Sequence, residues 1–269
     1  MRERDIRAMT AEMNDMHAET FPQLRESLGD LGSGLRKRLR TESASRRSFL
    51  VGGGTLLGAV ALAACSNGAT DNSTPGASGA PSSTGTGSAS PSGSAGGDIA
   101  ALATNASLEN LAVFAYGQAL MDAPKGKFGK SVPPAIAEFA KHAKAQHTDH
   151  AKAFNAALSK AGAQPFTKPD PALAGPVTEM YGKINDLPGL AKLALTLENT
   201  AAATYTKQMG ELTSAEAIAA VATIAPVERQ HAAILMYVLG EYPVPDTFVQ
   251  FGETATSLGA RPSSEAGVS

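Results

Sequence analysis

The sequence predicts an all-α fold in which one bundle of four helices follows an export signal and a polar linker. Three observations lead to this prediction. Four long segments show helical periodicity, no alternating β-strand pattern of useful length is present, and only one of the three connections between the segments is long. The predicted boundaries are residues 1–64 for the signal region, 65–97 for the linker, 98–242 for the bundle and 243–269 for a C-terminal tail.

Composition excludes several classes of function. The chain has 269 residues, of which 43 % are hydrophobic, so it can bury one sizeable core. A formal net charge of −2 gives nucleic acid no electrostatic reason to bind, and we expect no nucleic-acid partner. The single cysteine excludes a disulfide within the chain and a thiolate metal cluster.

Residues 1–64 have the pattern of an export signal. Ten of the 23 lysines and arginines lie in residues 1–47, and an uncharged apolar run follows over residues 51–64. This run is too short to span a bilayer comfortably as a permanent helix. Arg46 and Arg47, followed by Phe-Leu, resemble the twin-arginine signal that directs proteins to the Tat export machinery.

The cysteine lies at the end of this apolar run. Residues 62–65 read Leu-Ala-Ala-Cys and resemble a bacterial lipobox, in which Cys65 is lipidated and becomes the mature N-terminus. The alternative is a small buried residue, but no core surrounds this position. The resemblance implies an extracytoplasmic protein, lipid-anchored to the membrane of a bacterial cell envelope through Cys65. It also implies lipoprotein-processing enzymes as partners and removal of residues 1–64. Met13 and Met16 are alternative translation starts.

The linker carries almost no apolar or charged side chains. Residues 66–97 contain nine serines and eight glycines, and Asp71 is their single charge. Because such a segment cannot offset its ordering entropy by burial, we expect a flexible tether with a reach of roughly 30 Å.

The four predicted helices span about residues 99–121, 133–161, 188–209 and 216–240. Asp98 is the expected cap of the first helix. Pro134 is tolerated in the first turn of the second helix. Four prolines within residues 163–187 predict a crossover with at most one short helix.

The fourth helix has its own boundary signals. Residues 213–216 read Thr-Ser-Ala-Glu, which has the spacing of a capping box, and Gly240 is the expected end. Pro226 lies inside and is expected to kink the helix. Beyond Pro243 the chain is polar, and we expect a loosely packed tail.

The first and third predicted helices share a motif. A Leu-Glu-Asn triplet surrounds Glu109 and again Glu198, and a tyrosine follows each glutamate seven residues later, at Tyr116 and Tyr205. Five positions agree across nine residues. Seven residues make almost two helical turns, so each glutamate shares a helix face with its tyrosine.

The second and fourth predicted helices share a different motif. Glu228 and His231 form a Glu-x-x-His sequence, and His147 and His150 occupy the corresponding places with histidine in the first position. Residues three apart lie on one face, one turn apart, so each pair can converge on a metal ion.

Together these motifs resemble the ferritin-like di-iron or di-manganese carboxylate family over residues 99–240. The resemblance implies a ferritin-like four-helix bundle with one long crossover. By the family pattern the metal ligands would be Glu109, His150, Glu198, Glu228 and His231. His147 stands where the family has a carboxylate that commonly bridges two metals. Tyr116 and Tyr205 stand where related proteins place side chains that orient the carboxylates by hydrogen bonds.

The substitution at His147 changes the charge available to a metal. One imidazole nitrogen binds one cation, and three glutamates remain where the family has four. The six residues could therefore hold an asymmetric pair of ions or a single ion. Imidazoles favour iron, zinc or copper over magnesium or calcium, so we expect iron, mononuclear or dinuclear, with manganese, zinc or copper as alternatives.

Other polar side chains of these helices have simpler interpretations. His142, Asp149 and Glu138 are assigned to solvated faces, although Asp149 could supply the missing carboxylate in a distorted helix. His17 lies in the signal region and is given no role.

Three functions remain open. The bundle could be a metal-dependent redox protein acting on oxygen or peroxide, a lipoprotein that binds a metal or small ligand without turnover, or a metal-free bundle with a structural or interaction role. Whether the chain is an enzyme is left open, as is its oligomeric state. A storage cage is not expected, because a lipid-tethered subunit would have difficulty joining a closed soluble shell.

Overall fold

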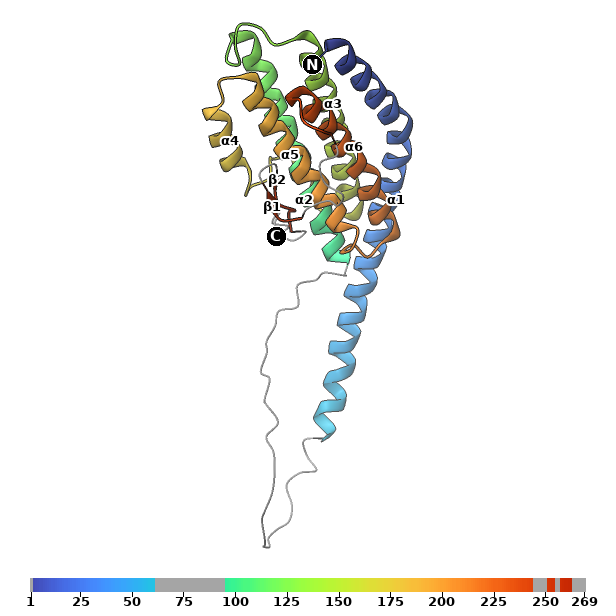
Figure 1. The fold of residues 1–269 in the computed structure, drawn as a ribbon. Helices are drawn as coiled ribbons and strands as arrows, with labels where there is room; N and C mark the ends of the chain where they lie inside the picture. The colour runs from blue at the N-terminus through green and yellow to red at the C-terminus, as the bar shows by residue number, and fades with distance from the viewer. Residues whose placement is uncertain (1, 61–94, 244–250, 255–256, 263–269) are drawn as a thin grey trace, which may run out of the picture. The chain divides into compact units, whose positions relative to one another are not determined.

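Four long helices form the bundle, which confirms the predicted all-α fold (Figure 1). They are α2 (Ala95–Asp122), α3 (Pro134–Ala161), α5 (Leu187–Gln208) and α6 (Ala215–Leu239). Helices α2 and α3 pack as one hairpin and α5 and α6 as a second. The 3-10 turn η1 (Ala123–Lys125) follows α2, and the long crossover contains one short helix, α4 (Ala174–Lys183).

The structure is a computed structural model that describes residues 2–60, 95–243, 251–254 and 257–262, with the backbone alone at 43–60. Two compact units are present, one of residues 1–36 with 91–269 and one of residues 37–90. Cys65 and almost all of the predicted linker lie outside the described residues, as do the side chains of Arg46 and Arg47. None of the described helices is both long and apolar enough to cross a membrane.

Two of the predicted helix caps are wrong in detail. Asp98 lies inside α2, and its carboxylate accepts hydrogen bonds from the backbone and hydroxyl of Thr213. Ser214, one residue later than expected, caps α6 by accepting the Ala217 N–H at 3.0 Å. Thr213 therefore joins the start of α6 to α2, a long-range contact that local spacing could not reveal.

The C-terminal ends of α3 and α6 follow the predicted chemistry. Gly162 and Gly240 end these helices with φ of 87° and 77°, in the left-handed region that a residue without a Cβ adopts without strain.

A first helix, absent from the sequence prediction, precedes the bundle. Helix α1 (Glu3–Val60) crosses both units, and its residues 3–36 belong to the same unit as the bundle. In this segment buried side chains recur every three or four residues, the period of a helix that packs on other helices. They are Ile6, Thr10, Met13, His17, Leu24, Leu28, Leu31 and Leu35.

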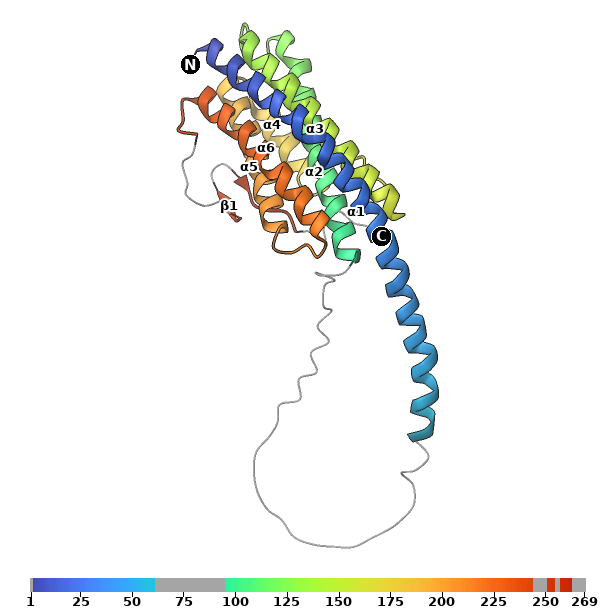
Figure 2. The same ribbon diagram turned by 90° about the vertical axis from the view of Figure 1, so that its right-hand side faces the viewer.

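The segment 3–36 runs along α3 and α6 (Figure 2). Arg7 forms an ion pair with Glu138 of α3 at 2.5 Å, and the hydroxyl of Tyr237 in α6 donates to Asp5 at 2.6 Å. His142, assigned from sequence to a solvated face, instead contacts the side chain of Asn14 at 3.0 Å.

Close approach of α1 to α3 depends on Gly32. A Cβ placed at Gly32 would collide with the backbone oxygen of Ala157 and lie 2.8 Å from the Cβ of Lys160. Neither atom is the mobile end of a side chain, so a larger residue here would push the helices apart. Two residues later, a Cβ at Gly34 would meet nothing within 4 Å.

Described parts of the C-terminal tail pack more firmly than expected. Strands β1 (Glu253–Thr254) and β2 (Ser257–Leu258) pair antiparallel, with Glu253 opposite Leu258. The Leu258 and Arg261 N–H groups donate to the hydroxyls of Thr200 and Thr204, both at 2.9 Å. The predicted loose packing is therefore wrong for residues 257–262, because helix-borne threonines satisfy their backbone.

We predict opposite effects for two glycine substitutions in α1. Alanine stabilises an exposed helix interior by up to about 1 kcal/mol relative to glycine, so Gly34→Ala should raise the melting temperature. Gly32→Ala should lower it, because its new Cβ meets the backbone of α3. Thermal unfolding followed by circular dichroism measures both, and stabilisation by Gly32→Ala would contradict the close contact of α1 with α3.

Candidate metal centre

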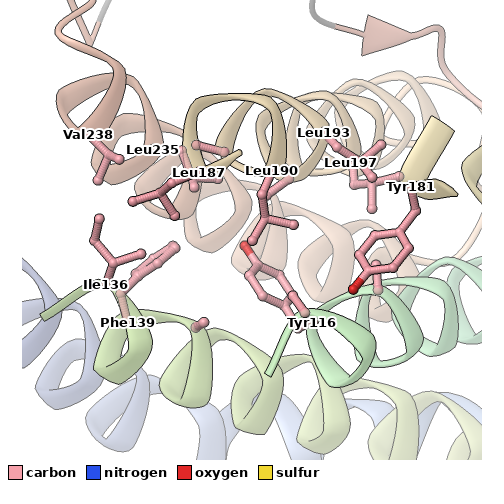
Figure 3. A pocket seen from close by; sticks show the side chains of 15 residues that line it. Tyr116, Ile136, Phe139, Tyr181, Leu187, Leu190, Leu193, Leu197, Leu235 and Val238 are labelled. Atoms are coloured by element: carbon pink, nitrogen blue, oxygen red, sulfur yellow. The ribbon is translucent and has the colours of Figure 1, made fainter. Parts of the chain in front are cut away.

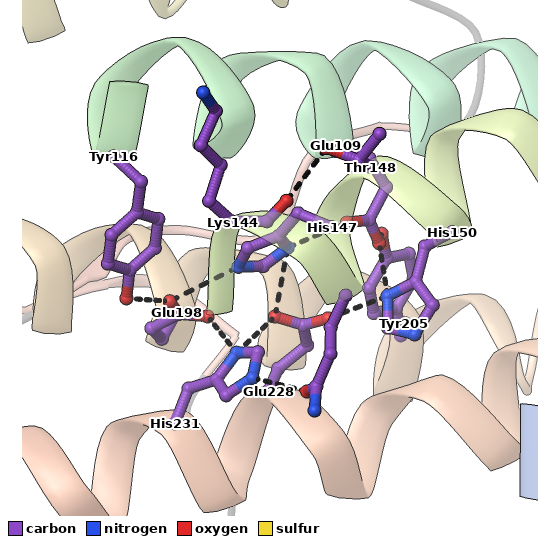
Figure 4. Close-up of polar contacts among 11 residues, drawn as sticks. Glu109, Tyr116, Lys144, His147, Thr148, His150, Glu198, Tyr205, Glu228 and His231 are labelled. Carbon is purple, nitrogen blue, oxygen red and sulfur yellow. Dashed lines mark hydrogen bonds and ion pairs between the residues drawn. The ribbon is translucent and has the colours of Figure 1, made fainter. Parts of the chain in front are cut away.

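All six residues expected as metal ligands meet inside the bundle (Figure 4). Each of the four bundle helices contributes, with one glutamate from α2, one from α5, two histidines from α3 and a Glu-His pair from α6. All six side chains are at most 1 % exposed: Glu109, His147, His150, Glu198, Glu228 and His231. Burial of so many ionisable groups is expensive unless they compensate one another or coordinate a metal.

The cluster contains two overlapping groups of ligand atoms, each within 4.8 Å. The first group comprises Glu109, His147, His150 and Glu228. The second comprises His147, Glu198, Glu228 and His231. His147 and Glu228 belong to both groups, so the cluster has the layout of two adjacent ion sites with shared residues.

His147 occupies the middle of the cluster. Its Nδ1 lies 2.7 Å from the carboxylate of Glu109, and its Nε2 lies 3.3 Å from the carboxylate of Glu198. The imidazole therefore joins a glutamate of one hairpin to the equivalent glutamate of the other by hydrogen bonds.

The two tyrosines of the repeated motif bond across the bundle. Tyr116 of α2 donates to Glu198 of α5 at 2.5 Å, and Tyr205 of α5 donates to Glu109 of α2. Each hairpin thus orients the carboxylate of the other. The predicted role of both tyrosines in holding carboxylates agrees with this arrangement.

One side of the cluster has unused polar atoms. Both ring nitrogens of His150 and both carboxylate oxygens of Glu228 are buried without a hydrogen-bond partner. His150 Nδ1 lies 3.4 Å from Glu109 and 3.6 Å from Glu228, which are ion-pair distances rather than good hydrogen bonds. Buried polar atoms without partners are rare in folded proteins, and atoms of these types are metal ligands. The donor set on this side therefore fits a transition-metal ion.

The other side of the cluster is more fully hydrogen-bonded. Nδ1 of His231 lies 3.2 Å from Glu198, and its Nε2 lies 2.9 Å from the side-chain oxygen of Gln146. Gln146 was not anticipated from the sequence, because a glutamine beside a histidine gives no metal-ligand spacing. Its buried contact fixes the orientation of the His231 ring.

For five of the six clustered residues, attraction to opposite charges outweighs the effect of burial on the pKa. Burial alone would raise the pKa of Glu109, but His150 and His147 lower it to about 2. Burial would lower the pKa of His150, but Glu109 and Glu228 raise it to about 9. In the same way, the pKa of Glu198 lies well below its ordinary value and that of His147 well above it. Without metal, Glu109 and Glu198 are ionised and His147 and His150 carry protons, so a metal ion must displace those protons.

His17 of α1 lies beside the cluster, contrary to the assignment of no role. It is 8 % exposed, its ring stacks on Phe21 at 4.9 Å, and the centre of its ring is 5.2 Å from that of His150. Burial and the positive charge of His150 lower the pKa of His17 to about 4. The α1 segment thus covers the side of the cluster that has unused ligand atoms.

Asp149 does not supply the missing carboxylate. Its side chain is 44 % exposed and faces Lys152 at 3.8 Å. The assignment of Asp149 to a solvated face is therefore confirmed.

A scan against models of protein families matches a ferritin-like domain over residues 97–241, more than half of the chain. The match begins near the start of α2 and ends just after α6, so it includes all six clustered residues. Searches of curated proteins and of solved structures returned no match.

We predict that the metal-free protein is most stable near pH 6.5. The raised pKa of His150 contributes stability that is complete below pH 6.5 and is lost as the pH rises to about 9. The lowered pKa of His17 removes stability as the pH falls from 6.5 to about 4. Glu109 then loses its contribution between pH 4.5 and about 2. Melting temperatures of chelator-treated protein across this range test the prediction, and a plateau extending to pH 9 would contradict it.

We predict that Tyr205→Phe destabilises the protein by about 1–3 kcal/mol, because it leaves a buried carboxylate oxygen of Glu109 without its donor. Tyr116→Phe should have a similar effect through Glu198. Tyr242→Phe is the matched control, since Tyr242 is 74 % exposed. Urea unfolding measures all three, and equal stability of Tyr205→Phe and the control would refute the crossed pairing.

Proposed function

The chain belongs to the ferritin-like family, and on this premise we propose that its bundle binds a transition-metal ion, iron in the first place, for redox chemistry with oxygen or peroxide. The observation that supports metal binding most directly concerns His150 and Glu228, whose four buried ligand atoms have no hydrogen-bond partner among the described residues. Manganese, zinc and copper are the alternatives that the same donor set would accept.

The geometry favours one ion over two. Glu109, His150 and Glu228 offer two carboxylates and an imidazole, and the atoms of His150 and Glu228 have no hydrogen-bond partner among the described residues. A second ion among His147, Glu198 and His231 would have to break hydrogen bonds at 3.2 and 3.3 Å. Two close cations would also have only three carboxylates to offset their charge. We therefore propose that one ion binds among Glu109, His150 and Glu228. The imidazole of His147 occupies the place of a second ion.

The bundle residues would support redox chemistry in distinct ways. A bound iron would supply the electrons for reaction with oxygen or peroxide. Tyr205 holds Glu109 in place, whereas no hydrogen bond from the described residues fixes the orientation of the Glu228 carboxylate, which would be one of the residues that hold the ion. Full burial separates the cluster from bulk solvent, which strengthens the electrostatic interactions within it.

A metal-free structural bundle is the second candidate, and His147 is the observation that favours it. Its imidazole is hydrogen-bonded to Glu109 and Glu198. Burial alone would lower its pKa, but the charges of the surrounding glutamates raise the pKa well above the ordinary value. A protonated His147 thus occupies the position of a cation between two carboxylates. If the rest of the cluster behaves similarly, the bundle needs no metal to be stable.

We propose that this domain is exported by the twin-arginine route and tethered through lipidated Cys65 to the outer side of the cell membrane. The support is the order of the sequence, in which an arginine pair, an apolar run, a Leu-Ala-Ala-Cys segment and a polar linker precede the bundle. The twin-arginine route transports folded proteins, which would allow a metal to be loaded before export.

We predict about one metal ion per chain after reconstitution of the full-length protein with iron, manganese, zinc or copper separately. Glu228→Ala combined with His231→Ala should abolish binding and any iron(II) oxidation by oxygen or peroxide. His147→Glu should raise the stoichiometry toward two, because it restores a fourth carboxylate. Elemental analysis of the purified variants gives the stoichiometry.

Asp149→Ala is the matched control, since this exposed carboxylate on α3 should leave binding unchanged. A stoichiometry below about 0.2 for every metal would favour the structural candidate over metal binding. If the protein binds iron stoichiometrically but does not oxidise iron(II), the result would favour a metal-binding protein without catalytic turnover.

For anchoring, we predict that Cys65→Ser moves the protein from the membrane fraction to the soluble fraction after expression in a bacterium, because it removes the site of lipidation. Replacing Arg46 and Arg47 by lysine should instead keep the protein in the cytoplasm. Cell fractionation followed by immunoblotting separates these results, and membrane retention of Cys65→Ser would refute the lipoprotein proposal.

A further inference from the structure

His17 of α1 is a buried histidine that the proposed metal site does not yet use. It belongs to residues 3–36, which pack on α3 and α6 in the same compact unit as the bundle (Figure 2). Its side chain is 8 % exposed, and its Nε2 is buried without a hydrogen-bond partner among the described residues. Such a nitrogen bears a desolvation cost that coordination to a metal ion would remove.

Neighbouring rings hold the imidazole of His17 next to α3. It stacks on Phe21, one turn later in α1, with the ring centres 4.9 Å apart and 15° between the ring planes. The ring of Phe21 also lies 6.1 Å from that of His150. The centres of the His17 and His150 rings are 5.2 Å apart. Stacking in α1 thus places one buried imidazole beside another that belongs to the ion cluster.

The spacing of these two imidazoles fits coordination of one ion by both. Bonds from a metal to an imidazole nitrogen are about 2.0–2.1 Å long, so two imidazoles on one tetrahedral ion have their ring centres roughly 5 Å apart. The distance between His17 and His150 agrees with this value. Both ring nitrogens of His150 lack a hydrogen-bond partner among the described residues, as does Nε2 of His17. The pair therefore has the spacing and the nitrogen atoms that a shared ion requires.

The Tyr116 side of the cluster offers no comparable ligand. There Tyr116 lines an apolar pocket between the two hairpins, with a cavity volume of about 50 Å³ (Figure 3). Tyr116 and Tyr181 carry the only polar side-chain atoms of its lining, and their hydroxyls already donate to Glu198 and Asp122. A further ligand for the ion is therefore expected from α1 rather than from this pocket.

We propose that Nε2 of His17 is a further ligand of the metal ion that Glu109, His150 and Glu228 hold. This inference rests on the proposed metal site and adds a residue of α1 to it. The two carboxylates offset the charge of a divalent ion, and the second imidazole supplies a fourth donor of a type that transition metals prefer.

A fourth ligand from α1 changes what the ion can do in the unprocessed chain. Four protein ligands complete a tetrahedral ion, as in structural sites, whereas three leave a position for a substrate. With His17 bound, residues 3–36 therefore close the ion to oxygen and peroxide. The proposed cleavage before Cys65 would remove His17 together with residues 1–64 and would open that position.

Zinc titration of the full-length protein tests the ligand. His17→Phe keeps an aromatic ring beside Phe21 but removes both ring nitrogens, so it should weaken zinc binding at least about tenfold. With chelator present, its melting temperature should equal or exceed that of the unaltered protein, because no unpaired nitrogen is left buried.

His142→Phe is the matched control. His142 of α3 contacts the side chain of Asn14 in α1 at 3.0 Å, so this change disturbs the same helix contact without removing a proposed ligand. The control should bind zinc as tightly as the unaltered protein does. If His17→Phe does not fold, His17→Gln takes its place, since glutamine keeps a polar group but lacks the imidazole.

Two further measurements separate coordination from packing. With copper(II) and isotope-labelled histidine, electron paramagnetic resonance detects each imidazole nitrogen on the metal, and His17→Phe should remove one of them. Zinc should also slow hydrogen exchange of the amides around His17 in the unaltered protein. It should not do so in His17→Phe, because the ion no longer joins α1 to the bundle.

Each outcome decides the inference. Weaker zinc binding by His17→Phe, with one fewer bound nitrogen and no loss of metal-free stability, supports His17 as a ligand. Equal zinc affinity of His17→Phe and the unaltered protein, or an equal loss in His142→Phe, overturns the inference and leaves the proposed metal site intact. Absence of metal binding by the unaltered protein overturns both.

Discussion

The fold depends on mutual compensation among three carboxylates and three imidazoles that the bundle excludes from water. A single unpaired charge at this depth would cost several kcal/mol, a large part of the stability of a domain of this size. Each of the four helices contributes to the cluster, so no helix can shift or rotate without leaving a partner unpaired. The cluster therefore fixes the register of the two hairpins more strictly than their alanine-rich apolar faces could, because methyl groups tolerate small displacements. A metal ion would take over a compensating role that the protonated histidines already perform.

The repeat between α2 and α5 predicted the candidate centre well, but it did not predict which tyrosine bonds which glutamate. Tyr116 and Glu109 share a face, yet seven residues correspond to about 10 Å along a helix axis, too far for a hydrogen bond. The tyrosine of one hairpin reaches the glutamate of the other because paired helices bring equivalent levels together. The four helices could be predicted from local periodicity, and the six clustered residues from two repeated motifs together with their resemblance to the ferritin-like pattern. The partners of Thr213 and Gln146 could not, since each contacts a residue far away in the sequence.

Residues 3–36 carry a second sequence pattern, which lies next to the proposed export signal. The arginines within residues 36–47 are typical of the basic part of an export signal, whereas the buried apolar residues of segment 3–36 have the spacing of a helix that packs on other helices. These buried residues include Ile6, Leu28 and Leu35, and their periodicity alone indicates a helix with one apolar face. What periodicity could not supply is the partner. Only the packed structure shows that Gly32 lets the segment approach α3 and that His17 reaches the neighbourhood of His150.

The apolar residues of segment 3–36 cover α3 and α6, whereas the proposed processing at Cys65 would remove that cover. In the full-length chain, side chains such as Ile6 and Met13 belong to the same apolar cluster as Phe139 and Leu235. Each buried apolar side chain is worth about 1.5–3 kcal/mol, so removal of residues 1–64 would expose a surface that costs more than a typical domain can spare unless something else covers it. It would also uncover His150, whose ring nitrogens have no hydrogen-bond partner among the described residues. A bundle that is stable after processing must therefore gain at this face, from a metal ion at His150 and a new apolar contact, what it loses with its N-terminal helix.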